Sequence, residues 1–139
     1  MCKLTSCSFS GTVVIRLMVG LVFLSEGVQK FLFSDIDGTG RFIKLSIPHA
    51  AFFGPFVGGT EILCGTLLVT GWLTRLACVP LLTVISMAIY YTKLPELKDK
   101  GIWSTAHDGR ADFCMMMGLI FLLLVGAGRY SIDNRYQPK

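Results

Sequence analysis

Four apolar stretches dominate the chain, and each is close to the length of a membrane-spanning helix. They lie at about residues 11–33, 51–72, 73–94 and 111–128. About 20 residues of α-helix cross the hydrocarbon core of a bilayer, and backbone groups in lipid must be hydrogen-bonded within their own segment. The pattern therefore predicts an all-α membrane protein. We expect one domain, an antiparallel bundle of four transmembrane helices with both termini on the same side.

The connections between these stretches differ in length and polarity. The second and third stretches join at GWLTR, residues 71–75, which predicts a tight antiparallel hairpin. Residues 34–50 contain the turn-like sequence DIDGTG and then mix basic with apolar residues, as interfacial segments do. Residues 92–113 are the most polar part of the chain and are predicted to connect the third and fourth helices.

Composition supports a membrane protein and excludes several other classes. Hydrophobic residues make up 53% of the chain and charged residues 16%, which leaves too little polar surface to cover a water-soluble fold. The net charge of +4 gives no basis for nucleic-acid binding. The five cysteines include no CxxC pair, and the two histidines lie in predicted connections, so we expect no metal site. The lipid bilayer is the partner that composition predicts.

The distribution of basic residues bears on orientation. Lysines and arginines are divided almost evenly between the two predicted sides of the membrane. The rule that basic residues favour the cytoplasmic side applies most strongly to short connections, and Arg75 lies in the shortest one. We therefore predict a multi-pass membrane protein with both termini in the cytoplasm.

Four charged residues fall inside the first two apolar stretches. Glu61 lies near the middle of the second stretch, Arg16 near the start of the first, and Glu26 and Lys30 near its end. A charge at the centre of a transmembrane helix costs about 2.5–3.5 kcal/mol, so such residues face the bundle interior and find partners. From the helical rise we expect Arg16 to reach toward Glu61. The i,i+4 spacing of Glu26 and Lys30 predicts a second pair.

A second polar group gathers near the opposite membrane surface. Tyr90 and Tyr91 end the third stretch, and Asp112 begins the fourth. Because the acids extend from mid-bilayer toward this side, we hypothesise a narrow cavity that Glu61 lines and that opens toward Tyr91 and Asp112. A buried ion-pair lock without a ligand explains the same charges equally well. The candidate ligand-binding residues are Arg16, Glu26, Lys30, Glu61, Tyr90, Tyr91 and Asp112.

Three segments together resemble a known family. They are RLMVGLVFLSEGVQKF, which begins at Arg16, GGTEILCGTLLVTGWLTRLA, which contains Glu61, and HDGRADFCMMMGLIFLLLVGAGRYSID, which ends at Asp133. In this order and spacing the chain resembles the DoxX family of small four-helix membrane proteins over essentially its whole length. The resemblance implies a bacterial inner-membrane protein associated with redox systems, in which some members are subunits of quinone-reducing oxidoreductases.

Two functions remain open. In the first, the protein binds a small lipophile of quinone type and serves a soluble or membrane-bound redox partner, without being catalytic alone. A quinone is then its cofactor, held without a covalent bond, and any enzyme activity belongs to the complex. The sequence has no haem-ligand pair, iron–sulfur pattern or nucleotide-binding loop, so the electrons must come from the partner. In the second, the bundle binds or transports a lipophile, or is a scaffold, with no redox role. Either function is compatible with a homo-oligomer.

Overall fold

The chain is helical throughout the residues that the structure describes. The computed structural model describes residues 4–128 and 130–133, with side chains from residue 11 onward. Its helices are α1 (Leu4–Leu32), α2 (Thr39–Lys44), α3 (Ala50–Thr70), α4 (Thr74–Lys100), α5 (Ile102–Asp108) and α6 (Arg110–Val125). No strand occurs in the described ranges, which confirms the all-α prediction. The prediction that both termini share one side concerns chain ends that lie outside these residues.

Three of the helices are long and apolar enough to cross a membrane. They are the part of α1 from Gly11 to Leu32, then α3 and α4. The helix α6 has 16 residues and follows the 7-residue α5 with only Gly109 between them. Several apolar helices of this kind are typical of a multi-pass membrane protein.

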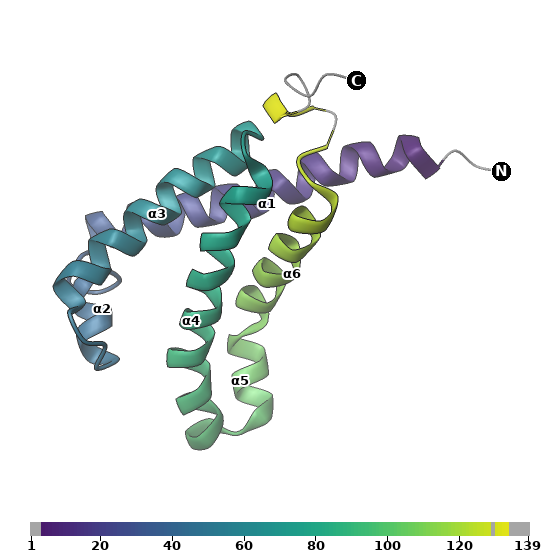
Figure 1. Ribbon diagram of the computed structural model, residues 1–139. Coiled ribbons are helices and arrows are strands. Elements are labelled where there is room, and N and C mark those ends of the chain that lie inside the picture. The colour runs from purple at the N-terminus through teal and green to yellow at the C-terminus, as the bar shows by residue number, and fades with distance from the viewer. Residues whose placement is uncertain (1–3, 129, 134–139) are drawn as a thin grey trace.

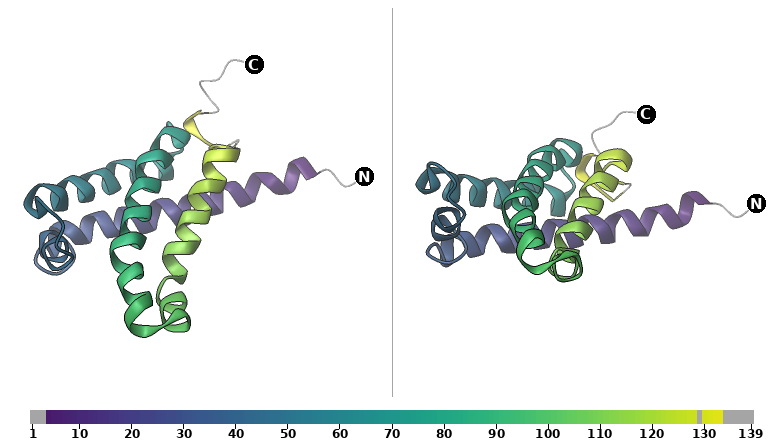
Figure 2. Two further views of the ribbon diagram at one scale, coloured as in Figure 1. Left: turned by 60° about the horizontal axis from the view of Figure 1, so that its bottom comes forward. Right: turned by 90° about the horizontal axis from the view of Figure 1, so that it is seen from below.

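The helices form two arms that meet at one end. In one arm α1 and α3 lie side by side and run in opposite directions, while α4 pairs with α5 and α6 in the other (Figure 1). The arms meet near the α3–α4 turn and the end of α6, and they diverge toward α2 on one side and α5 on the other (Figures 1 and 2). This arrangement is more open than the bundle expected from sequence. We call the end where the arms meet, at the α3–α4 turn and the end of α6, the closed end.

The helix α4 is longer than its apolar pattern suggests. It continues to Lys100 instead of ending near residue 94, and most of the predicted polar connection is helical because α5 follows it. In the last turns of α4, Glu96 accepts hydrogen bonds from Lys93 at 3.2 Å and Lys100 at 3.1 Å. These residues are good helix formers at pairing distance, so the helix extends although its hydropathy falls.

The tight turn predicted between the second and third stretches is confirmed, but the two helices diverge from it instead of packing antiparallel along their length (Figure 1). The helix α3 ends at Thr70, and α4 begins at Thr74. Gly71 adopts the left-handed conformation (φ 71°, ψ 36°), and its N–H donates to the carbonyls of Leu67 and Leu68. Glycine adopts this conformation without a Cβ penalty and is the residue that commonly ends a helix in this way.

The apolar core lies where the two arms meet. It draws buried residues from α1, α3, α4 and α6, namely Val19, Phe23, Cys64, Leu68, Ala77, Cys78, Leu81, Ile85, Met115, Leu119 and Leu122. Many other large apolar side chains are exposed, among them Leu63, Leu76 and Leu124. An exposed apolar surface of this extent is unfavourable in water but suits contact with lipid.

Candidate functional site: a charged cluster between α1 and α3

Close packing through glycine sets the register of α1 against α3. A Cβ atom on Gly27 would lie 2.8 Å from the carbonyl oxygen of Gly58, and one on Gly20 would lie 3.1 Å from that of Gly65. A side chain at these positions of α1 would therefore force the two helices apart. Small residues at such contacts let membrane helices approach closely, and here they place the end of α1 against the first half of α3.

This register brings three charged side chains together. Lys30 Nζ donates a hydrogen bond to Glu61 Oε2 at 2.7 Å, and the same nitrogen lies 3.8 Å from Glu26 Oε2. The side chains of Lys30 and Glu61 are 10% and 4% exposed, whereas that of Glu26 is 50% exposed. We call Glu26, Lys30 and Glu61 the charged cluster. The predicted pairing of Glu26 with Lys30 is confirmed, and Glu61 joins it.

The charged cluster continues the buried face of both helices. Along α1, Glu26 follows the core residue Phe23 by three positions, which places both on one face. Along α3, Glu61 precedes the core residue Cys64 by the same interval. The cluster therefore lies one helical turn beyond the apolar core, on the side where the two arms diverge.

Arg16 does not belong to this cluster, and the expected Arg16–Glu61 pair is wrong. Arg16 is buried, and its Nη1 and Nη2 donate to the carbonyls of Ala127 at 2.8 Å and Tyr130 at 2.9 Å. It lies against Gly71, whereas Glu61 is ten residues before Gly71, or about 15 Å along the helix. The expectation placed residue 11 level with the α3–α4 turn. The Gly20–Gly65 and Gly27–Gly58 contacts instead bring Arg16 level with that turn.

The closed end is held by residues that sequence reasoning did not select. The carboxylate of Asp133 accepts hydrogen bonds from the backbone N–H groups of Leu73 at 2.7 Å and Thr74 at 3.0 Å. Its own N–H donates to the carbonyl of Gly71 at 3.0 Å. A carboxylate here accepts from backbone N–H groups that have no partner within the helix. Its negative charge also interacts favourably with the positive N-terminal end of the α4 dipole. The signal was the sequence GAGRYSID, which carried the family resemblance but was given no structural role.

Tyr90, Tyr91 and Asp112 lie on the other arm and are not brought to the charged cluster. The rings of the two tyrosines contact each other at the end of α4, with centroids 5.3 Å apart. Asp112 lies in the first turn of α6. The views in Figures 1 and 2 show this part of the molecule diverging from the ends of α1 and α3. A cavity from Glu61 to these residues, as predicted, would therefore have to extend from one arm to the other across the region where the arms separate. Ligand binding by the seven candidate residues stays a prediction.

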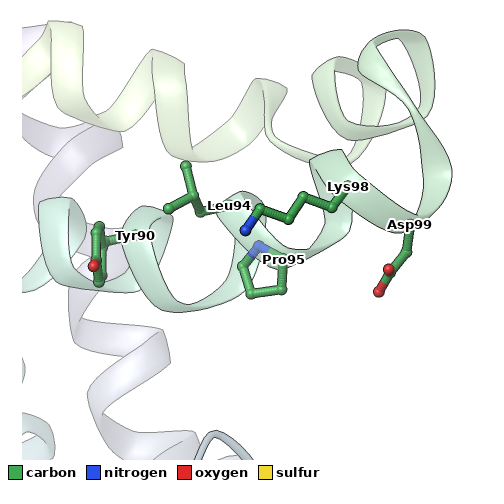
Figure 3. Close-up of a pocket in the computed structure, with 5 residues that line it drawn as sticks. All are labelled: Tyr90, Leu94, Pro95, Lys98 and Asp99. Atoms are coloured by element: carbon green, nitrogen blue, oxygen red, sulfur yellow. The ribbon is translucent and has the colours of Figure 1, made fainter.

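A surface depression of about 290 Å³ occurs at the end of α4. It is lined by Tyr90, Leu94, Pro95, Lys98 and Asp99, with Lys98 reaching back toward Pro95 (Figure 3). All five residues belong to one helix, so the depression has no opposing wall with which to enclose a ligand. Among the described residues, histidines, cysteines and acids form no group of three suited to a metal ion.

Comparison with known proteins identifies the family. The model of the DoxX family matches residues 11–94, which is more than half of the chain. This chain belongs to the DoxX family. The match includes the charged cluster and most of α4, while α5, α6 and Asp133 lie beyond it.

A relative of this DoxX protein supports the assignment to the membrane. The chain is 51% identical over 133 residues to an uncharacterized membrane protein of Mycobacterium tuberculosis, and the alignment covers 91% of this chain and 82% of the relative. No solved structure matches the chain. The family resemblance drawn from the sequence is thus confirmed, and the chain is a DoxX-family membrane protein.

Proposed function

We propose that this DoxX-family protein binds a small lipophile of quinone type and holds its polar head at the charged cluster. The observation that carries the proposal is the buried Lys30–Glu61 hydrogen bond of 2.7 Å, between two predominantly apolar helices. Buried charges in membrane helices are costly, and they commonly mark substrate or proton pathways. The protein then serves a redox partner in the membrane and is not catalytic alone.

The membrane arrangement that suits this proposal has four spans. Alone, the 16 residues of α6 reach about 24 Å, less than the hydrocarbon core of about 30 Å. With Gly109 and the 7 residues of α5, the segment reaches about 36 Å and can cross as one interrupted helix beside α4. We place both termini on the cytoplasmic side of the bacterial inner membrane, as the basic residue in the shortest connection favours. Glu61 is then about 15 Å from the α3–α4 turn and lies within the hydrocarbon region.

The chemistry of the charged cluster fits the head of a quinone. Lys30 has three N–H donors, and one of them is committed to Glu61 Oε2. A further donor can bond a carbonyl oxygen, and a carboxylate oxygen of Glu61 can accept from the hydroxyl of the reduced form. Glu26 is the exposed member of the cluster, so a head group approaches from its side. The tail of the ligand then lies along apolar helix faces in lipid.

An ion-pair lock without a ligand is the second candidate, and one observation favours it. Glu61 is only 3% exposed and already hydrogen-bonded. In that case the pair fixes α1 against α3, and the protein acts as a scaffold or a lipophile carrier with no redox role. The two candidates differ in whether a bound molecule accepts a hydrogen bond from Lys30.

A binding experiment separates these candidates. The full chain is placed in nanodiscs of zwitterionic lipid, and binding of a quinone with a ten-carbon tail is measured by native mass spectrometry and equilibrium dialysis. We expect saturable binding of one quinone per chain and a loss of at least tenfold in affinity for Lys30→Met. Because that variant leaves Glu61 buried without a partner, the double variant Lys30→Met, Glu61→Gln, which keeps no buried charge in the pair, should show the same loss. Glu96→Gln, which removes an acid from the other arm, is the matched control and should bind normally. Absence of saturable binding, or equal affinity in Lys30→Met and the unaltered chain, contradicts the proposal.

A further inference from the structure

The charged cluster has unequal numbers of acidic and basic groups. It contains two carboxylates, Glu26 and Glu61, and one ammonium group, Lys30. With all three ionised, the cluster carries one excess negative charge. The ammonium lies between the two acids, at 2.7 Å from Glu61 and 3.8 Å from Glu26. Its positive charge is therefore already matched before any ligand enters.

The remaining cations of this region are too distant or too exposed to reverse that balance. Arg16 is bound to backbone carbonyls at the closed end. Arg41 and Lys44 of α2 are both exposed, so their charges are screened more strongly than those of the buried pair. A head group at the cluster thus meets a negative local field.

The exposures of the three side chains determine which charge a ligand meets first. Glu26 is half-exposed, whereas the side chains of Lys30 and Glu61 are 10% and 4% exposed. A ligand that approaches from the exposed side of the cluster therefore meets Glu26 before the ammonium group of Lys30. Because the one ammonium group is already shared between two carboxylates, an approaching anion meets a net negative charge, which disfavours its binding.

From this arrangement we propose that the charged cluster selects lipophiles with uncharged or cationic heads and excludes those with anionic heads, and that Glu26 sets this selectivity. The inference rests on the proposed function, because it concerns what the same site accepts. A quinone presents neutral carbonyls, to which Lys30 donates without giving up its pairing with Glu61. A fatty-acid carboxylate would place a third negative group around one ammonium. The abundant anionic lipids of a bacterial membrane would then be kept out of the site.

The test compares two probes with equal tails in the same nanodiscs of zwitterionic lipid. The probes are the quinone with a ten-carbon tail and decanoate, each measured with the full chain at neutral pH. We expect the quinone to bind at least about tenfold more tightly than decanoate. In Glu26→Gln the affinity for decanoate, relative to that for the quinone, should rise about tenfold, because one repulsive charge is removed. Glu96→Gln, with the same change of charge on the other arm, should alter neither affinity.

The outcomes distinguish a failure of the proposed head-group selectivity from a failure of the proposed lipophile binding. If decanoate binds the unaltered chain as tightly as the quinone, the selectivity is refuted and the lipophile site remains. If Glu26→Gln leaves the affinity for decanoate unchanged, Glu26 does not set the selectivity. If neither probe binds, the proposed function itself fails and the inference falls with it. Because Glu26 is half-exposed, its replacement by glutamine should fold, and a melting temperature close to that of the unaltered chain verifies this.

Discussion

Lys30 of α1 and Glu61 of α3 form a 2.7 Å hydrogen-bonded ion pair at a glycine-packed contact between two apolar helices. The pair lies one turn beyond the apolar core, where the helix pairs begin to separate. Its two members depend on each other, because Glu61 alone would be a buried and uncompensated charge, and Lys30 alone would keep only the half-exposed Glu26 as a partner. This dependence gives the first prediction.

Glu61→Gln should destabilise the protein, because it leaves Lys30 with only the half-exposed Glu26, 3.8 Å away, as a charged partner. Removing one partner of a buried ion pair costs about 3–5 kcal/mol. Lys30→Met alone should be costly for the same reason, and the double variant Lys30→Met, Glu61→Gln should recover a large part of the loss. The measurement is reversible unfolding in mixed detergent micelles, arranged as a double-mutant cycle. If the two single losses simply add in the double variant, the residues do not interact.

Arg16 and Glu61 should show no such coupling. The two residues lie at levels about 15 Å apart along the helix pair, and substitutions at distant sites without shared partners add within about 0.3–0.5 kcal/mol. The same unfolding assay on Arg16→Gln, Glu61→Gln and their combination tests this. A coupling energy above about 1 kcal/mol would restore the pairing expected from sequence.

Gly27→Ala should separate α1 from α3. The new Cβ would lie 2.8 Å from the carbonyl oxygen of Gly58, a backbone atom that cannot move aside without shifting α3. Overpacking of this kind costs about 1–3 kcal/mol. Gly11→Ala is the matched control in the same helix, since nothing lies within 4 Å of its added Cβ. That variant should be neutral or slightly more stable because alanine favours helix. Equal stability of the two variants would show that Gly27 is not a close contact.

Asp133→Ala should weaken the closed end by about 1 kcal/mol, the usual cost of losing a helix-capping side chain. Two backbone donors at the start of α4, those of Leu73 and Thr74, lose their acceptor. Amide hydrogen exchange should become faster at Thr74 and its neighbours, with little change around Glu61. The exposed Asp35 in the turn after α1 is the control. An equal effect of Asp35→Ala would rule out specific capping by Asp133.

The helical class and the Glu26–Lys30 pair could be predicted because each depends on local sequence patterns. Hydropathy located the long apolar helices, and the glycine of GWLTR marked the α3–α4 turn. The i,i+4 spacing linked Glu26 to Lys30 without any knowledge of the fold. The register between helices could not be predicted in this way. It depends on which glycines of α1 and α3 touch, and without those contacts the helical rise alone paired Glu61 with Arg16 instead of Lys30.

Features that depend on long-range packing also escaped prediction. Asp133 is 60 residues from the N–H of Leu73 to which it bonds, and no local pattern joins them. The divergence of the two arms separates Asp112 from Glu61, although both had been assigned to the same side of the membrane. The spacing of residues along a helix gives their heights in a bundle, but it does not give the angles between the helices.

The central claim, that a lipophile head binds at the charged cluster, is tested most directly by photolabelling. A photoreactive quinone is irradiated with the full chain in nanodiscs, and labelled peptides are mapped by mass spectrometry in the unaltered chain and in Lys30→Met. We expect labelling to be concentrated in residues 23–30 of α1 and 57–64 of α3. Excess unlabelled quinone should compete with this labelling, and Lys30→Met should reduce it at least tenfold. Labelling spread evenly over the exposed helix faces, or confined to residues 90–99 of α4, would contradict it.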